Sequence, residues 1–489
     1  MSDIESPLIT ASRDFPGQSA LINEDFTFTY PKYLTCVSVV KTHLINAGIR
    51  PCDRVSCLIE NRLEYPIVLM ALLHLGAVAC TLSTRLPSTA INHLLKKVKT
   101  PFFITTKKTL PIDFSSQAKL IFIEDLVDLN VIQGAPTDNE NLSLDQDASI
   151  MFTSGSMGIP KPVVLSFGNH YYSALGSNMN IPLGSLDRWL ITLPLYHVGG
   201  QAILYRAMLA GAACVIPKKP DDVLENIKKF KITHVSLVST QLFRLLKINE
   251  SRKTLSSIKA ILIGGSAIPQ ELLNEAYAKG LPVHVTYGLT EMASQVSTTR
   301  AHDSVEKLLT AGVLLPHREL KISGSGEIFV RGKTLFKGYI EEENIHRPGD
   351  AEGWFHTGDT GYMTDKGTLV ITGRADNMFI SGGENIQPEE IEAALTNIPD
   401  VRQAIVVPVE NAEFGWRPVA FVKMRDNVSS EEKSLDQELR RFLPGYKIPD
   451  HFLSWPENAL NPEGKPDRQK LALTAKSRLT SSPSPLTQL

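Results

Sequence analysis

The feature that most constrains the fold is an alternation of apolar runs of strand length with longer segments of helical periodicity. Residues 54–59 form such a run ahead of a helical pattern over 65–75, and residues 258–263 stand in the same relation to 269–279. This alternation is typical of α/β folds with largely parallel sheets. A chain of 489 residues is too long for one hydrophobic core, so we expect more than one domain.

The pattern changes beyond about residue 312. Residues 323–330 and 367–372 resemble hairpin strands with Gly-rich turns, which predicts a small antiparallel β unit. A compact α+β unit with a βαβ-like start is expected next, with strands over 378–380, 403–408 and 419–423 and helices over 388–396 and 430–442. We therefore predict an α/β N-terminal domain of parallel-sheet subdomains plus the small β unit over residues 1–375. The predicted C-terminal α+β domain covers residues 376–489.

Composition argues against several classes of function. The net charge of −2 gives no general attraction to nucleic acids or anionic membranes. The acidic N-terminus has no apolar stretch after it, so we expect no signal peptide. The apolar run 66–82 contains His74 and Gly76 and is short for a membrane span, which favours a buried helix, a turn and a strand. This short run leads us to expect no stable membrane insertion. The 5 cysteines include no C-x-x-C pair, so we expect reduced core thiols in a cytoplasmic protein.

Residues 152–161 form a polar loop directly after a short apolar segment. The loop offers hydroxyl groups, glycines that leave backbone N–H groups accessible, and a lysine, a combination that suits a phosphate group. These residues are Thr153, Ser154, Gly155, Ser156, Gly158 and Lys161. The loop is not a Walker A loop, because no Ser or Thr follows the lysine. Residues 332–334, Gly-Lys-Thr, also fail that pattern, because Glu327 stands where its first glycine belongs.

A series of motifs follows this loop in order. They are Tyr-Gly-Leu-Thr-Glu at 287–291, Thr-Gly-Asp at 357–359, Gly-Arg-Ala-Asp at 373–376, Ser-Gly-Gly-Glu at 381–384 and Gly-Lys at 464–465. With them, the chain resembles the acyl- and aryl-CoA synthetase branch of the adenylate-forming superfamily over nearly its whole length. The resemblance implies that ATP and Mg²⁺ convert a carboxylic acid to an acyl-adenylate, and that CoA then takes the acyl group. It also implies that the small C-terminal domain is mobile.

The resemblance assigns the nucleotide contacts. Residues Thr153, Ser154, Gly155, Ser156, Gly158 and Lys161 would surround the β- and γ-phosphates. Residues Gly265, Ser266, Ala267 and Tyr287 would lie around adenine, with Tyr287 stacked on the base, and Gly288 is also assigned to the nucleotide site. Asp359 and Arg374 resemble the pair that contacts ribose. Thr290 resembles the α-phosphate contact, and Glu291 the carboxylate beside magnesium, which prefers hard oxygen ligands.

The same resemblance makes Lys465 the catalytic lysine that bridges the substrate carboxylate and the α-phosphate. The alternative for Lys465 is a solvated surface lysine, as most lysines are. Asp376 matches the hinge between the domains, where backbone torsions change during rotation. The residues that would line the pantetheine tunnel are Ser381, Gly382 and Gly383, and those at the nucleotide end of CoA are Arg85, Phe414 and Trp416. For Phe414, packing in an aromatic core is an equal alternative.

Two residues depart from the pattern of the phosphate loop. Met157 stands in place of a second threonine, and Pro162 in place of a glycine. Met157 removes a hydroxyl group, and Pro162 removes an N–H group and stiffens the exit of the loop. We expect binding of ATP to survive, because the other motif residues are all present. A non-catalytic nucleotide-binding protein is the alternative that these departures raise.

The residues around His197 resemble the segment that builds the acyl pocket, to which Gly264 and Thr286 are also assigned. Residues 193–201 contain no carboxylate that could hold an ammonium group, which argues against an amino acid as substrate. Arg206 follows on an apolar run, and a buried arginine needs a partner. That partner is either structural, such as Glu291 or a helix carbonyl, or a second carboxylate on the substrate.

The choice of acid rests on a closer resemblance. Residues 193–210, 233–242, 381–391 and 413–418 resemble the 2-succinylbenzoate–CoA ligases of menaquinone synthesis, whose substrate carries two carboxylates. The alternative within the superfamily is a ligase for another aryl acid such as benzoate. The sequence leaves the oligomeric state open, a homo-oligomer included.

Overall fold

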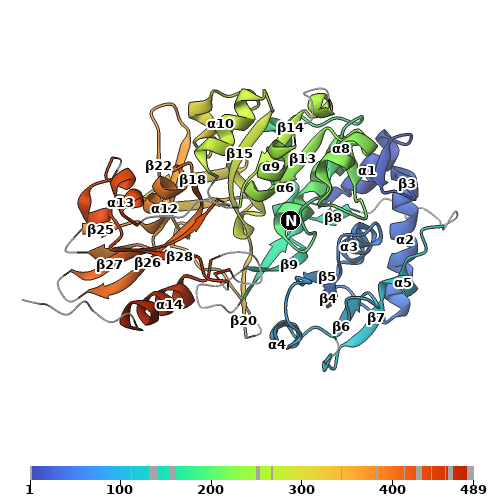
Figure 1. Cartoon of the computed structure of the whole chain (residues 1–489). Coiled ribbons are helices and arrows are strands. Elements are labelled where there is room, and N and C mark those ends of the chain that lie inside the picture. Colours follow the sequence, from blue (N-terminus) through green and yellow to red (C-terminus); the bar gives the residue numbers. More distant parts are fainter. Residues whose placement is uncertain are drawn as a thin grey trace, which may run out of the picture.

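The computed structural model describes residues 3–111, 113–130, 141–153, 160–248, 254–265, 268–342, 344–381, 384–411, 414–425, 432–441, 443–457, 459–460 and 466–481. Figure 1 shows the chain running from the N-terminal helices and sheets on one side to the C-terminal sheet on the other. A short antiparallel pair joins β1 (Asp3–Glu5) to β8 (Asn141–Ser143).

The first large sheet holds the ends of the predicted phosphate loop. Among the described residues it has the strand order β21-β20-β10-β9-β5-β4-β6-β7. The strands are β4 (Arg54–Leu58), β5 (Val78–Thr81), β6 (Phe102–Thr105), β7 (Lys119–Phe122), β9 (Asp147–Thr153), β10 (Lys161–Ser166), β20 (Gly338–Glu341) and β21 (Asn344–His346). Strands β4 to β7 and β9 run parallel, and β10, β20 and β21 are added antiparallel. The helices of this region are α2 (Tyr30–Asn46), α3 (Glu64–Leu75), α4 (Ser88–Val98) and α5 (Ile123–Leu126).

The second large sheet has the order β17-β16-β15-β14-β13-β11-β12-β2-β3. Its strands are β2 (Ser19–Ile22), β3 (Thr27–Thr29), β11 (Arg188–Leu190), β12 (Ala213–Val215), β13 (His234–Leu237), β14 (Ala260–Ile263), β15 (Val283–Leu289), β16 (Ser294–Thr298) and β17 (Val313–Leu314). The helices around it are α1 (Pro7–Asp14), α6 (Phe167–Asn180), α7 (Val198–Ala210), α8 (Val223–Phe230), α9 (Ser239–Lys247), α10 (Gln270–Ala278) and α11 (Val305–Leu308), with 3₁₀ turns η1 (Thr254–Ser257) and η2 (Thr290–Met292). The parallel core of both sheets confirms the predicted α/β class.

The apolar run 66–82 is a buried helix followed by a strand, as predicted. Every residue of α3 after Glu64 is buried, and Gly76 ends the helix in the left-handed conformation at φ 78° before β5 begins. Within the described part of the chain, no helix is both long enough and apolar enough to cross a membrane.

A small antiparallel sheet follows, with the order β18-β19-β22-β23. Its strands are β18 (Arg318–Ile322), β19 (Glu327–Gly332), β22 (Phe355–Met363) and β23 (Leu369–Arg374). The pairing of β22 with β23 sets Asp359 directly opposite Arg374. Strand pairing therefore brings the two predicted ribose contacts together.

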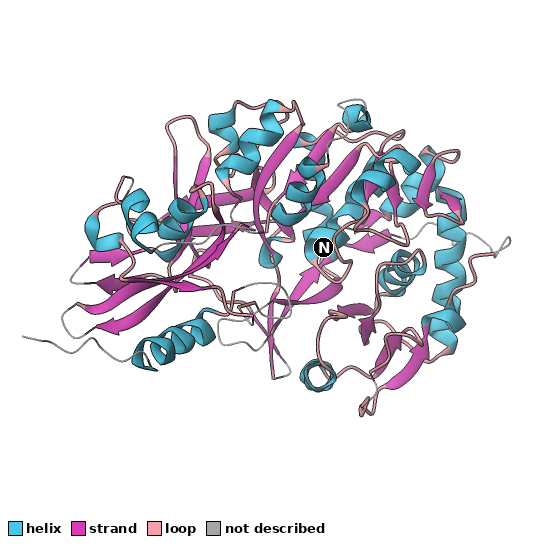
Figure 2. Ribbon diagram, viewed as in Figure 1, coloured by secondary structure: helices cyan, strands magenta, loops and turns pink. Residues whose placement is uncertain are grey.

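The C-terminal unit is a sheet with helices on both faces (Figure 2). Its elements are β24 (Phe379–Ser381), β25 (Glu384–Ile386), α12 (Pro388–Thr396), β26 (Val401–Asn411), β27 (Gly415–Met424), α13 (Glu432–Leu439), η3 (Gly445–Lys447), β28 (His451–Ser454) and α14 (Arg468–Ser481). Strands β24, β26 and β27 pair antiparallel, and only β28 joins β27 in parallel, so the βαβ-like order does not give a parallel pair at its start.

The two faces of this sheet have separate cores, because side chains alternate along a strand. On β26, Val406 faces the cluster that includes Ile391 of α12, whereas Ile405 faces the cluster that includes Leu471 of α14. Neither cluster contains a buried residue from before Phe379.

Candidate active site

The two ends of the predicted phosphate loop lie side by side. Thr153 ends β9, Lys161 begins β10, and the antiparallel register pairs these two residues. The loop predictions on Ser154, Gly155, Ser156 and Gly158 fall outside the described residues, as does the departure at Met157. Thr153 also lines a small cavity together with Tyr196 and His197, so the start of the phosphate loop and the predicted acyl segment line the same cavity.

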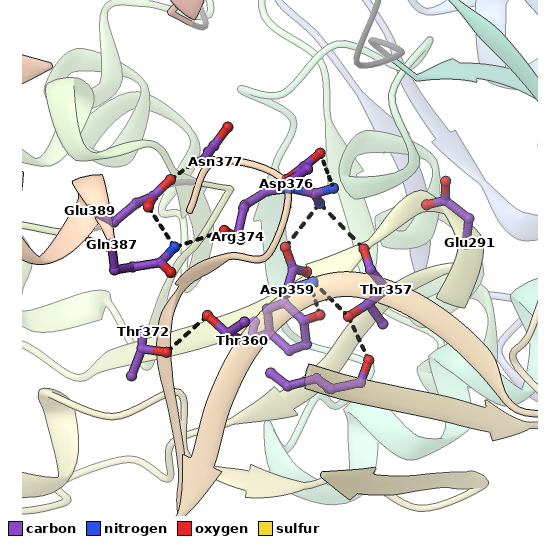
Figure 3. Close-up of polar contacts among 12 residues, drawn as sticks. Glu291, Thr357, Asp359, Thr360, Thr372, Arg374, Asp376, Asn377, Gln387 and Glu389 are labelled. Atoms are coloured by element: carbon purple, nitrogen blue, oxygen red, sulfur yellow. Dashed lines mark hydrogen bonds and ion pairs between the residues drawn. The ribbon is translucent and has the colours of Figure 1, made fainter. Parts of the chain in front are cut away.

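A polar network joins the predicted ribose pair, Asp359 and Arg374 (Figure 3), to Tyr287. The Tyr287 hydroxyl donates to Asp359 Oδ2 at 2.6 Å, and Arg374 Nη1 donates to Asp359 Oδ1 at 3.0 Å. Arg374 Nη1 also reaches the carbonyl oxygen of Thr357 at 3.3 Å. Each oxygen of the Asp359 carboxylate therefore accepts a hydrogen bond from a different strand, which fixes its plane.

Burial and charge act on this network in opposite directions. Burial raises the pKa of Asp359, and the Tyr287 hydroxyl and the Arg374 guanidinium oppose that rise. Burial and the neighbouring carboxylate raise the pKa of Tyr287 well above its ordinary value, so Tyr287 remains a donor. The hydrogen bonds that Arg374 donates to Asp376 are the largest of the effects that raise the pKa of Arg374.

Asp376, the predicted hinge, holds the other edge of the same guanidinium. Arg374 Nε and Nη2 donate to Asp376 Oδ1 and Oδ2 at 2.8 Å and 3.0 Å, a two-pronged pair. Burial is the largest single effect and would raise the pKa of Asp376, but the hydrogen bond and charge of Arg374, a backbone hydrogen bond and the charge of Arg468 together lower that pKa below its ordinary value. The pair links the last residue of β23 to the start of the C-terminal unit.

Gln387 also spans this boundary, and no role was predicted for it from the sequence. Its Nε2 donates to the carbonyl oxygen of Arg374 and to Glu389 Oε2, both at 2.8 Å (Figure 3). Asn377 Nδ2 donates to the other oxygen of Glu389 at 2.5 Å. A side chain at Gly373 would come within 2.2 Å of Gln387, so only glycine permits this approach.

Thr290 and Glu291 lie on the 3₁₀ turn η2, at the end of β15. Glu291 Oε1 accepts a hydrogen bond from the Tyr339 hydroxyl at 2.7 Å, and Tyr339 was not predicted from the sequence. Burial raises the pKa of Glu291, and the bond from Tyr339 opposes that rise. Lys161 lies over the Tyr339 ring at 5.3 Å from its centre, so Tyr339 connects the exit of the phosphate loop to Glu291.

The adenine segment is described only in part. Gly265 adopts φ 89° after β14, whereas Ser266 and Ala267 fall outside the described residues. Gly288 lies on β15, where any side chain would come within 2.1 Å of the carbonyl oxygen of Ser294.

The residues predicted to bind the acid, called the acid side below, are His197, Gly264, Thr286 and Arg206. The first of them lies at the N-terminus of α7. His197 is the N-cap residue of this helix, and its ring meets that of Tyr196 edge-on at 4.6 Å. Gly264 faces Thr286 so closely that a side chain would come within 2.6 Å of Thr286 Cγ2. The Thr286 hydroxyl already donates to the carbonyl oxygen of Ser297 at 2.8 Å, so its polar group is held by β16.

Arg206 is the charged residue of this side, and it is only 1% exposed. Its guanidinium lies over the Trp189 ring at 5.4 Å, and Nη2 donates to Ser294 Oγ at 3.3 Å. The Nε atom is buried without a hydrogen-bond partner, and no carboxylate of the described residues forms an ion pair with Arg206. Glu291 is therefore not its partner in this structure. Burial lowers the pKa of Arg206 to about 9.

The predicted CoA residues lie on the C-terminal unit, apart from Arg85. Ser381 Oγ accepts a bond from Arg417 Nη1 at 3.4 Å, and Arg417 lies over the Phe414 ring at 5.5 Å. Phe414 and Trp416 are each 42% exposed, which rules out the core-packing alternative for Phe414 in this arrangement. Gly382, Gly383 and the catalytic candidate Lys465 fall outside the described residues. Exposed Arg85 forms no described ion pair with this surface.

Comparisons with known proteins agree with these motifs. Residues 9–340 match the AMP-binding enzyme family, and residues 390–465 match the AMP-binding enzyme C-terminal domain. The chain is 35% identical to a 2-succinylbenzoate–CoA ligase of Bacillus licheniformis over 91% of this chain and 95% of that protein.

Solved structures of one relative differ in their likeness to this chain. The o-succinylbenzoate CoA synthetase of Bacillus subtilis, in complex with the acyl-adenylate intermediate OSB-AMP, matches with a TM-score of 0.87 and 32% identity over 96% of this chain and 98% of that one. A double mutant of that enzyme, bound with its product analogue OSB-NCoA, matches at the same identity and coverage with a TM-score of 0.71.

Proposed function

Because this chain belongs to the AMP-binding enzyme family, we propose that it joins 2-succinylbenzoate to CoA for menaquinone synthesis. It forms the acyl-adenylate from the acid and ATP, releases pyrophosphate, and then transfers the acyl group to CoA with release of AMP. The observation that carries this proposal is the likeness to ligases of that name over 91% of the chain. The motifs of the nucleotide site, all present in order, make it an AMP-forming acid–CoA ligase.

In the first step a carboxylate oxygen of the acid attacks the α-phosphorus of ATP, and the bond to the β-phosphate oxygen breaks. Negative charge grows on phosphoryl oxygens, so positioned cations and hydrogen-bond donors lower the barrier. In the second step the thiolate of CoA attacks the acyl carbon, and the bond to AMP breaks.

We assign the residues of the first step as follows. Thr290 contacts the α-phosphate, and Lys465 bridges it to the attacking carboxylate. Glu291 suits Mg²⁺, because Mg²⁺ in nucleotide sites uses one or two protein carboxylates and takes other ligands from phosphates and water. With Asp359 and Arg374 fixed by the Tyr287 network, the ribose hydroxyl groups meet a carboxylate whose orientation is already set.

Arg206 selects the acid in this proposal. Its guanidinium is buried and lacks a carboxylate partner among the described residues, and 2-succinylbenzoate has a second carboxylate that is not activated. That carboxylate would neutralise the buried charge, directly or through water. A plain benzoate could not do this, so the environment of Arg206 favours the diacid over the benzoate alternative.

The division into domains at residues 375 and 376 is part of the proposal, with Asp376 as the hinge. The separate buried clusters beyond Phe379 support it. Ser381, Phe414 and Trp416 would then meet CoA after rotation of the C-terminal domain. We place the enzyme in the cytoplasm, where ATP and CoA are available.

The experiment combines the purified chain with ATP, Mg²⁺, CoA and a panel of aryl acids. We expect the thioester of 2-succinylbenzoate, with equal amounts of AMP and pyrophosphate, and much less product from benzoate. Release of ADP and phosphate would contradict the adenylate mechanism. A preference for benzoate would favour the alternative, a ligase for another aryl acid.

The separate roles of Lys465 and Asp376 are tested by measuring adenylate formation and acyl transfer to CoA separately. Lys465→Ala should slow formation of the acyl-adenylate by about 100- to 1,000-fold, while synthetic acyl-adenylate still reacts with CoA. Asp376→Pro should do the reverse, because proline fixes φ and blocks rotation. Asp376→Ala is the matched control, since it removes the same carboxylate without fixing φ. Equal loss of both half-reactions in folded Lys465→Ala and Asp376→Pro would contradict the hinge.

A further inference from the structure

Tyr339 is the residue that joins the parts of the nucleotide site most directly. Its hydroxyl donates to Glu291 Oε1 at 2.7 Å, and its ring lies 5.3 Å from the ammonium nitrogen of Lys161. Glu291 lies on η2 and Lys161 on β10, so a single side chain contacts both the carboxylate assigned to magnesium and the exit of the phosphate loop. No motif in the sequence assigned a role to Tyr339.

The surrounding segment holds the main chain of Glu291 as well. The backbone N–H of Phe336 donates to the carbonyl oxygen of Glu291 at 2.7 Å. The Phe336 ring is fully buried and meets the Tyr339 ring edge-on at 4.9 Å, a favourable arrangement of two aromatic rings. Residues 336–339 therefore fix both the backbone and the carboxylate of Glu291.

Strand pairing fixes the position of this segment in turn. Tyr339 pairs with Val163 in the antiparallel register of β20 with β10. Lys337, two residues earlier, forms an ion pair with Asp147 at 2.5 Å at the start of β9. A side chain at Gly338 would come within 2.4 Å of the carbonyl oxygen of His346, so the neighbouring strand also limits movement. Tyr339 is thus held by the sheet rather than by a loop.

We infer that Tyr339 is a positioning residue of the Mg²⁺–ATP site, an inference that rests on the proposed function. Its hydroxyl occupies one oxygen of Glu291 and so fixes the direction in which the carboxylate faces the cation. Its ring holds the Lys161 ammonium beside the phosphate loop through a cation–π contact. Groups that orient a metal ligand in this way commonly contribute about 10- to 100-fold to metal affinity.

The test uses Tyr339→Phe, which removes only the hydroxyl and keeps the ring under Lys161. Calorimetry without acid or CoA should show about 10-fold weaker binding of Mg²⁺–ATP, whereas ATP in EDTA should bind within about two-fold of the wild type. Tyr362→Phe is the matched control, because Tyr362 is 53% exposed on β22 and donates no hydrogen bond among the described contacts. The control should bind Mg²⁺–ATP as the wild type does.

A double-mutant cycle separates positioning from a general structural role. In a Glu291→Gln background, Tyr339→Phe should change the affinity for Mg²⁺–ATP by less than about two-fold, because the bond acts only through that carboxylate. Tyr339→Leu also removes the ring, so it should weaken binding of ATP in EDTA as well. Binding by Tyr339→Phe that equals the wild type, or an equal loss with and without Mg²⁺, would overturn the inference.

These measurements are independent of the acid and of turnover. Failure of the proposed function would appear as an absence of acyl-CoA and AMP from the wild-type chain, whereas failure of this inference would appear only in the affinities of the variants. Thermal unfolding of each variant with Mg²⁺–ATP gives a second readout. The stabilisation by Mg²⁺–ATP over metal-free ATP should shrink in Tyr339→Phe and persist in Tyr362→Phe.

Discussion

Two arginines of the candidate site, Arg374 and Arg206, lie in opposite surroundings. Arg374 has a side chain 45% exposed, and it donates to two carboxylates, those of Asp359 and Asp376. Arg206 is 1% exposed, and its one hydrogen bond to a described residue goes to the Ser294 hydroxyl at 3.3 Å. Neighbouring carboxylates raise the pKa of Arg374, whereas burial lowers that of Arg206 to about 9.

In the proposed function, the protein supplies the counter-charge of Arg374, and the substrate supplies that of Arg206. A buried charge without a partner is unfavourable, and a binding anion removes that penalty. On the nucleotide side, Arg374 is already paired with Asp359 and Asp376 before ATP arrives. On the acid side, the Arg206 guanidinium has no carboxylate partner among the described residues, so the proposed function makes the free energy of binding depend on the second carboxylate of the acid.

The strongest test of this comparison is Arg206→Ala. Loss of a buried charge pair should raise the KM for 2-succinylbenzoate with a smaller fall in kcat, the pattern of lost ground-state binding. The fall in kcat/KM should correspond to a free energy of about 2–5 kcal/mol if Arg206 contacts the carboxylate directly, and to a smaller one if water bridges the two groups. For benzoate the same change should matter little, and Arg206→Lys should recover only part of the loss. Equal damage with both acids would make Arg206 a structural residue.

On the nucleotide side, Tyr287→Phe removes the bond to Asp359 and keeps a ring for stacking on adenine. A hydrogen bond to a carboxylate contributes about 1.5–3 kcal/mol. The KM for ATP should therefore rise by the factor that corresponds to a loss of about that much binding free energy. The KM for 2-succinylbenzoate should stay unchanged, because this network has no described contact with Arg206. Steady-state kinetics with each substrate varied in turn measures both. A rise in both KM values would show that the two sides are coupled.

Lowering the pH should reduce the free energy of unfolding through His170, which lies near the predicted acid-binding residue Arg206. His170 stacks on Tyr205, the neighbour of Arg206, at 4.7 Å, and burial lowers the pKa of His170 to about 3. An unfolded histidine binds its proton near pH 6.5, so the unfolded state gains protons first and stability falls as the pH drops below 6.5. The fall is about 1.4 kcal/mol per pH unit for one such group.

His170→Gln tests this slope, because glutamine can keep a bond to Ser149, which lies 2.8 Å from His170 Nε2. Urea unfolding between pH 6.5 and 5 should show a shallower loss of stability in the variant. Parallel loss in the variant and the wild type would show that other groups control acid unfolding.

Local patterns predicted much of the fold, whereas the roles assigned to the site residues stay predictions. The helix over 388–396 and the buried helix and strand within 66–82 are where the sequence placed them. Contacts between distant segments were not predictable, because they depend on which strands pair. Tyr339 meets Glu291 only because β20 adds to β10, and no periodicity records that choice.

Backbone conformation explains a second gap. Ser294 reaches Arg206 because Ala293 and Ser294 adopt φ angles of 51° and 107°, which residues with side chains rarely do. Neither is glycine, so the sequence gives no sign of the turn. Such strain is found at sites that the surrounding structure holds firmly.

The smallest expected effect lies at the boundary between the two proposed domains. Arg425, which follows β27, forms an ion pair with Glu271 of α10 at 3.0 Å, and both side chains are about two-fifths exposed. The structure of this chain is more similar to that of the relative bound with the acyl-adenylate than to that of its double mutant bound with a product analogue, with TM-scores of 0.87 and 0.71. The pair should therefore favour the orientation used to form the adenylate.

Charge reversal measures how much this pair contributes. An exposed pair contributes about 0.2–1 kcal/mol, so Arg425→Glu should slow adenylate formation by about 1.5- to 5-fold and leave transfer from synthetic acyl-adenylate to CoA unchanged or faster. Adding Glu271→Arg should restore the first rate, because the swapped pair has the same geometry with opposite signs. Arg441→Glu makes the same change in net charge at a side chain that is 66% exposed and that, among the described residues, pairs with nearby Glu438; it should leave both rates unchanged. The effect of Arg425→Glu should also fade in about 1 M salt, where the Debye length falls to about 3 Å.

If the double reversal is as slow as the single one, Arg425 acts through some other contact. The orientation is then set by Gln387 and the Arg374–Asp376 pair instead.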